Sequence, residues 1–211
     1  MTQATILKNI LKVQSGLFVL WVIATSIGMG MAYGLWLIAY LSHSVLLVVA
    51  VLGVSGCVMG FAQWRVLRSR VAGVGHKWSG GMWALGSAVG GSLTALASLA
   101  YLTGFSLASI LLVASGGATM GLIQSAGLRH HLSGIRWWAP WTLTNGCVLP
   151  AWVLLLALSP TRPRGIPAEV FFGAITLVHS AITGAVLVWL LWEAPRVPNA
   201  HFSSASLRWR S

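Results

Sequence analysis

Residues that could carry out chemistry are scarce in this sequence. Only two of its 211 residues are acidic, Glu169 and Glu193. Paired-carboxylate catalysis and hard-metal sites, which need several carboxylate oxygens, are therefore nearly excluded. The two cysteines, Cys57 and Cys147, lie far from the spacing of metal ligands, and we interpret them as small packing residues. We expect neither an enzymatic activity nor a metal site.

His179 is the ionisable residue that most strongly suggests a function. It lies between Val178 and Ser180 in a long apolar run, and an ionisable group deep in a membrane is a functional-site hypothesis by default. It could relay protons, or bind a haem or chlorophyll-type ring as an axial ligand, although no C-x-x-C-H motif accompanies it. The alternative is a structural role, in which a backbone carbonyl or Asn145 satisfies the neutral imidazole.

A serine near the middle of the chain offers one enzymatic alternative. The segment Gly53-Val54-Ser55-Gly56 resembles the G-x-S-G motif of rhomboid-type intramembrane serine proteases. Those proteases take their catalytic His from the last span, which would correspond to His179. The placement differs, because Ser55 falls in the second predicted helix whereas the Ser of that family lies in the fourth. A protease with Ser55 and His179 is therefore a minor alternative.

Two glutamines stand in a repeated motif. Gly56, Met59, Gly60, Gln63, Leu67 and Arg68 recur, 61 residues further on, as Gly117, Met120, Gly121, Gln124, Leu128 and Arg129. In a third copy Leu187 replaces the Gln and Trp192 replaces the Arg, so that packing residues remain and polar ones are lost. This self-similarity predicts an internal repeat whose unit is a helical hairpin.

The repeated residues share one helix face, because the glycines, the Gln and the Leu are separated by three or four residues. We interpret Gln63 and Gln124 as amides that bond a neighbouring helix. The functional alternative is a shared polar site for a ligand or a lipid headgroup. Arg68 and Arg129 are expected to anchor helix ends to the phosphates of lipid headgroups.

Runs without charge define the elements that position these residues. The chain is 57% hydrophobic and 7% charged, against about 25% charged residues in a soluble domain. A charge at the middle of a bilayer costs on the order of 2.5 to 3.5 kcal/mol, and roughly 20 residues cross it as a helix. The charge-free runs cover residues 13–64, 78–128, 137–161 and 170–192.

These runs predict an all-α integral membrane protein with six transmembrane helices, arranged as three parallel-repeat hairpins. We expect the helices at residues 16–41, 44–67, 79–102, 106–128, 137–158 and 168–192, with tight turns at residues 42–44 and 103–104. The hairpin repeats cover residues 16–68, 79–129 and 137–192 of a bundle that spans residues 16–192.

Glycines and tryptophans indicate how the helices pack. Glycines four residues apart, such as Gly30 and Gly34, predict close approach of helix backbones. Most of the twelve tryptophans, Trp21 and Trp64 among them, are expected at the membrane interface. The deeper ones are expected to be Trp83, Trp141 and Trp152.

Basic residues set the orientation. Eleven of the thirteen Lys and Arg residues fall on one side of this arrangement, and only Arg162 and Arg164 fall on the other. The positive-inside rule makes that side cytoplasmic, with both termini there. Anionic lipid headgroups explain these basic residues, and nucleic acid does not, because they border the spans and form no separate domain.

The two ends of the chain differ from the bundle. Residues 1–15 have the spacing of an amphipathic helix that lies on the membrane surface. Residues 193–211 have no apolar periodicity and are expected to form a flexible cytoplasmic tail. We expect the membrane to be a bacterial cytoplasmic (inner) membrane or a photosynthetic membrane derived from it.

The repeated pattern also resembles a known group of sequences. A Trp-led helix with Gly seven residues on, then G-x-x-Q-x-x-x-L-R in the next helix, then the final segment at residues 183–191, is similar to multi-pass membrane proteins of bacteria, including cyanobacteria. That group has no established activity. The resemblance therefore implies a membrane fold and assigns no site residue.

The sequence favours a non-enzymatic protein that acts by binding. The leading hypothesis is an accessory, assembly or scaffold subunit of a larger membrane complex, or a lipid-binding bundle. The alternative is a small transporter or channel, with a polar pathway at the repeat axis lined by Gln63, Gln124, Asn145 and His179. A transporter usually needs buried carboxylates for its coupling ions, and this chain lacks them.

Overall fold

The described part of the chain is helical almost throughout. The computed structural model describes residues 3–70, 77–103, 107–128, 138–158 and 168–193. The helices are α1 (Gln3–Leu41), α2 (Val45–Arg70), α3 (Lys77–Thr103), α4 (Leu107–Leu128), α5 (Trp138–Leu158) and α6 (Ala168–Glu193). The predicted all-α class is confirmed for these residues. The helices lie within a few residues of their expected bounds, except that α1 begins earlier.

Four of the helices are long and apolar enough to cross a membrane. The qualifying stretches are Gln14–Leu35 in α1, Val45–Ser69 in α2, Leu107–Gly127 in α4 and Gly173–Leu191 in α6. Large apolar side chains such as Leu46, Leu111 and Leu177 are exposed on their outer faces. An apolar surface of this kind suits contact with lipid acyl chains, and the protein is therefore a multi-pass membrane protein.

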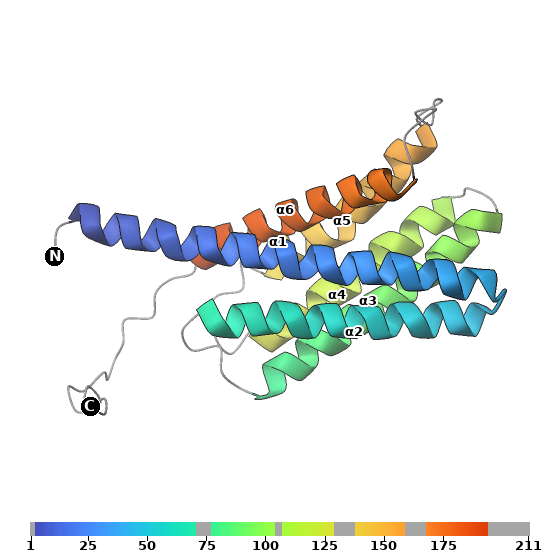
Figure 1. Ribbon diagram of the computed structural model, residues 1–211, viewed down its shortest axis with the longest axis horizontal. Helices are drawn as coiled ribbons and strands as arrows, with labels where there is room; N and C mark the ends of the chain where they lie inside the picture. The colour runs from blue at the N-terminus through green and yellow to red at the C-terminus, as the bar shows by residue number, and fades with distance from the viewer. Residues whose placement is uncertain (1–2, 71–76, 104–106, 129–137, 159–167, 194–211) are drawn as a thin grey trace.

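The helices form a closed ring. Among the described residues, the backbone of each helix lies close to that of the next along the chain, from α1 through to α6, and α6 lies close to α1, whereas the backbones of other helix pairs do not approach each other. Figure 1 shows the helices running roughly along one direction, with α1 and α2 as an antiparallel hairpin. Each helix thus turns one face toward the centre of the ring.

A tight turn joins α1 to α2 at the predicted place. His43 adopts a left-handed backbone conformation with φ of 55°, which reverses the chain direction in a short distance. Ser44 then caps α2, because its Oγ accepts a hydrogen bond from the Leu47 N–H at 3.3 Å. The predicted turn at Gly104, the predicted lipid anchor Arg129 and the tail after Glu193 lie outside the described residues.

The first described residues of the chain are helical and continuous with α1, while the candidate span begins at Gln14. The segment predicted as a separate surface helix, residues 1–15, is helical from Gln3 and continues without a break into α1, which is 39 residues long. In Figure 1 this helix extends beyond the rest of the bundle at its N-terminal end.

Two contacts in the ring are close because a glycine faces a backbone carbonyl. A Cβ atom at Gly56 in α2 would collide with the carbonyl oxygen of Ser87 in α3, and a Cβ atom at Gly117 in α4 would collide with that of Asn145 in α5. One turn later, a Cβ atom at Gly60 would lie 2.7 Å from the carbonyl oxygen of Trp83. Any larger residue would push these helix pairs apart.

Gly30 and Gly34 do not take part in such contacts. Both are exposed, and a Cβ atom at either would have no neighbour within 4 Å. The prediction that this pair brings two helices of the chain together is therefore wrong. The reason is rotational: Gly28 is the glycine of α1 that turns inward, against Met59, and residues two and six positions further on point away from that face.

Replacing the inward glycines should destabilise the bundle. We expect Gly56→Ala and Gly117→Ala each to lower the melting temperature in detergent, because overpacking a close contact costs about 1 to 3 kcal/mol. Gly30→Ala is the matched control and should leave it unchanged. Thermal unfolding followed by circular dichroism measures the effect. Equal melting temperatures for Gly117→Ala and Gly30→Ala would contradict the close contact between α4 and α5.

Candidate functional site

Three tryptophans meet at the centre of the ring. Trp21 of α1, Trp83 of α3 and Trp141 of α5 are at most 2% exposed. Their ring centroids lie 6.0 Å apart for Trp21 and Trp83, 5.7 Å for Trp21 and Trp141, and 5.9 Å for Trp83 and Trp141. Edge and tilted contacts of this geometry are favourable between aromatic rings. We call these residues the tryptophan cluster.

The repeated glutamines hold this cluster in place. Gln63 accepts a hydrogen bond at Oε1 from Trp83 Nε1 at 3.0 Å, and its Nε2 donates to Thr25 Oγ1 at 2.9 Å. Gln124 accepts from Trp141 Nε1 at 3.0 Å and donates to Ser87 Oγ at 2.9 Å. Each amide therefore links its own hairpin to the first helix of the next one, which agrees with the structural interpretation of these residues.

The third connection uses different groups. Trp21 Nε1 donates to Thr183 Oγ1 of α6 at 3.3 Å, and Leu187 is 2% exposed at the position where the other two copies have Gln. Thr183 precedes Leu187 by one helical turn, so the acceptor has moved along α6. All three indole N–H groups of the tryptophan cluster are thus paired.

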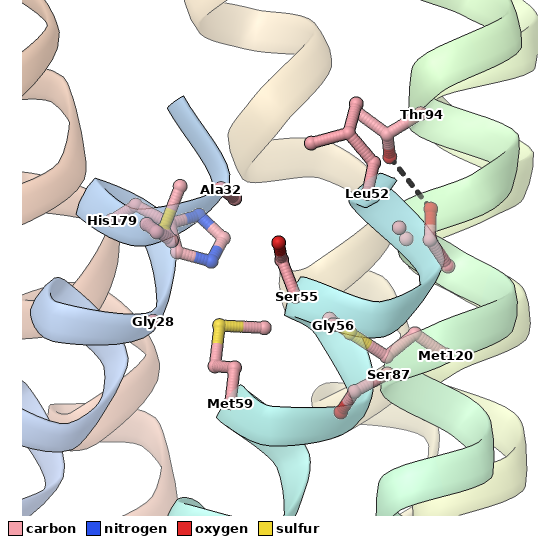
Figure 2. Close-up of a pocket in the computed structure, with 14 residues that line it drawn as sticks. Gly28, Ala32, Leu52, Ser55, Gly56, Met59, Ser87, Thr94, Met120 and His179 are labelled. Atoms are coloured by element: carbon pink, nitrogen blue, oxygen red, sulfur yellow. Dashed lines mark hydrogen bonds between the residues drawn. The ribbon is translucent and has the colours of Figure 1, made fainter. Parts of the chain in front are cut away.

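His179 lies in a separate site, at a small cavity. The cavity has a volume of about 120 Å³, and its lining includes Gly28, Ser55, Met59, Met120 and His179. Figure 2 shows the His179 ring and the Ser55 and Met59 side chains facing the same space. His179 is 4% exposed, and its Nδ1 has no hydrogen-bond partner among the described residues. A backbone carbonyl or Asn145 was expected to satisfy the imidazole, and neither does so at this nitrogen.

The structure does not bring the four predicted ligand-binding residues together. Of Gln63, Gln124, Asn145 and His179, only His179 lines the cavity. The Asn145 amide donates to the Trp141 carbonyl of its own helix at 2.9 Å. Gln63, Gln124 and Asn145 therefore do not share the cavity that His179 lines.

The geometry gives little support to the two alternatives that involve His179, namely an intramembrane serine protease and a subunit that binds a haem or chlorophyll-type ring. Ser55 lines the same cavity, but its hydroxyl donates to the Val51 carbonyl at 2.8 Å and forms no hydrogen bond with His179. A serine nucleophile needs an adjacent base to activate it. Pockets for drug-sized ligands measure about 300 to 1,000 Å³, so the cavity of about 120 Å³ has no room for a haem or chlorophyll-type ring.

Arg68 lies at the end of α2, where it was predicted to contact lipid phosphates. Its side chain is exposed, and the guanidinium carbon lies 5.3 Å from the centroid of the Trp64 ring. Contact with this indole face leaves the charged group accessible. Trp64 itself is only 6% exposed and packs with the tryptophan cluster. Its ring faces the interior of the bundle and not lipid, because α3 covers it through Gly80.

The sequence interpretation missed the tryptophan cluster as a unit. Trp83 and Trp141 were expected to lie deep and Trp21 at the membrane interface, and all three are buried side by side within the ring. A signal was present, because each of the three tryptophans is followed four residues later by a small polar residue, namely Thr25, Ser87 and Asn145. This spacing places an indole and a polar group on one inward helix face.

Comparisons with protein-family models, with curated proteins and with solved structures found no match to this chain. Among the described residues, no group of three or more His, Cys, Asp or Glu side chains is placed to hold a metal ion.

A double-mutant cycle should measure the bond between α4 and α5. We expect Gln124→Leu and Trp141→Phe each to destabilise the protein, and the double variant to be less destabilised than the sum. The reason is that each single change leaves a buried polar partner unpaired. The coupling free energy should be about 0.6 to 1.7 kcal/mol, the range of such bonds in membrane bundles. Reversible unfolding in mixed micelles gives the values, and strictly additive effects would contradict the bond.

Proposed function

We propose that this protein is an accessory, assembly or scaffold subunit of a larger membrane complex, and that it acts by binding other membrane subunits. The observation that carries the proposal is the pairing of the central polar groups inside the chain. Gln63, Gln124 and Thr183 all bond the tryptophan cluster. A transport pathway needs polar groups that are free to meet a passing solute, whereas these amides hold helices together.

The outer surface supports the same proposal. Gly30 and Gly34 of α1 are exposed and have no neighbour within 4 Å of a Cβ position, beside the exposed apolar residues Ile27, Met31 and Ile38. In membranes, small residues four apart let a second helix approach closely. We call this part of α1, residues 27–38, the outer glycine face, and we propose it as the contact for the partner subunit.

The proposal includes six spans in three parallel hairpins with both termini in the cytoplasm. Support comes from the ring, because α3 packs against the candidate spans α2 and α4, and α5 packs against α4 and α6. A helix held between two spans along the ring is itself expected to cross the bilayer. The bias of basic residues orients the hairpins. We place the protein in a bacterial cytoplasmic membrane or a photosynthetic membrane derived from it.

Reporter fusions test this topology. A reporter at Gly104 or Gly165 should be active outside the cytoplasm, and one at Gly73 or Ser133 should be active inside, because eleven of the thirteen Lys and Arg residues fall on the side of Gly73 and Ser133. Paired alkaline phosphatase and green fluorescent protein fusions give the two readouts. If Gly73 and Gly104 reported the same compartment, α3 would not be a span.

Affinity purification from native membranes tests the binding function. The tagged chain should co-purify with one or more multi-pass proteins in mild detergent, and Gly30→Ile or Gly34→Ile should release them, since a branched side chain blocks close helix approach. Gly173→Ile is the matched control, because Gly173 is also exposed with open space around it but lies on α6. Neither Gly30→Ile nor Gly34→Ile should alter the melting temperature. A partner that is retained in Gly30→Ile and Gly34→Ile would show that the outer glycine face is not the contact.

A further inference from the structure

The cavity beside His179 has a donor set that the proposed function does not use. His179 Nδ1 is buried and has no hydrogen-bond partner among the described residues, and leaving a buried polar atom unpaired is unfavourable. The ring faces the cavity in Figure 2. A group that enters the cavity could accept or provide the missing interaction, so this nitrogen points to a ligand.

Sulfur atoms surround the same cavity. Three of the six methionines of the chain, Met29, Met59 and Met120, line it together with His179. Met59 and Met120 hold the same position in the two copies of the repeated motif, four residues before the Gln. Methionine is also a common gap-filler in apolar cores. Here, however, the three side chains line an open space that His179 also lines.

The chemical type of these donor atoms indicates which metal ion the cavity would bind. Thioether sulfur and neutral imidazole are soft, uncharged donors, and thioethers favour Cu(I) among biological metal ions. Hard cations need oxygen ligands, and the only two carboxylates of the sequence, Glu169 and Glu193, lie at opposite ends of α6, far along the helix from His179. The thiols of Cys57 and Cys147 are exposed on the outside of the ring and do not line the cavity.

Size and charge agree with a single monovalent ion. A cavity needs only about 10 to 15 Å³ to hold one water-sized group, so about 120 Å³ accommodates an ion with some remaining space. Taking a charge out of water is costly, and a singly charged ion with four soft donors keeps that cost lower than a divalent one. We propose that Met29, Met59, Met120 and His179 form a binding site for Cu(I), or for Ag(I) as its redox-inert analogue.

A competition titration tests the site. The full-length chain with Cys57→Ser and Cys147→Ser, which removes the thiols, is purified in detergent and titrated without oxygen with Cu(I) held by a chromophoric chelator. We expect it to withdraw one equivalent of Cu(I). In the same background, Met59→Leu/Met120→Leu and His179→Ala should each weaken binding at least about tenfold, as loss of metal-site groups does. Ag(I) should raise the melting temperature of the parent and not of these variants.

Matched variants separate this site from other metal binding and from misfolding. Met31→Leu removes an exposed thioether next to the inward-facing part of α1 and should change neither binding nor melting temperature. Leu and Met have similar volumes, so the double Leu variant should remain folded. Failure of the parent to take up Cu(I), or equal uptake by the double Leu variant, would overturn the proposal. An equal loss of binding in Met31→Leu would overturn it as well.

Discussion

An indole N–H group at the centre of a membrane bundle has no water to accept its hydrogen bond, so the protein must supply an acceptor. This chain buries three such groups against one another, and the positions of the acceptors determine how the helices are joined. A glutamine amide suits the task because its oxygen accepts from the indole while its nitrogen donates elsewhere. Gln63 in α2 thereby connects Trp83 in α3 with Thr25 in α1. One side chain joins three helices and ties the first hairpin to the second.

The hydrogen bonds depend in turn on how closely the backbones approach. Burying a leucine against another helix gains little over lipid in a membrane, so contact has to come from small residues and polar bonds. The repeated motif provides both, because Gly60 and Gln63 are adjacent on the same face of α2. The glycine lets α2 reach the backbone of α3 at Trp83, and this approach brings the Trp83 indole within 3.0 Å of the Gln63 amide. A larger residue at Gly60 would lengthen the bond that the Gln is there to make.

The helices could be predicted from the sequence because a charge in the bilayer carries a large cost, which confines charged residues to the ends of the spans. The ends of α2 to α6 follow this signal closely. The contacts between hairpins could not be predicted in the same way. The charge pattern does not tell whether Trp21 lies at the interface or at the centre, since both places suit an amphipathic ring. The rotation of α1 about its own axis decides which way the Trp21 side chain faces. That rotation depends on Thr183 in α6, a residue 162 positions away from Trp21.

The third repeat differs from the other two at the residue that faces the cavity. The sequence match that pairs Gly56 with Gly117 and Ser180 also pairs Ser55 with Gly116 and His179. Three identical copies would place the same group around the axis, and a buried imidazole repeated three times would be costly to desolvate. Instead, the third copy exchanged its Gln for Leu187 and carries the only histidine of the set. Because Thr183 replaces the lost acceptor for Trp21, α6 still closes the ring, and His179 is left without a structural bond at Nδ1.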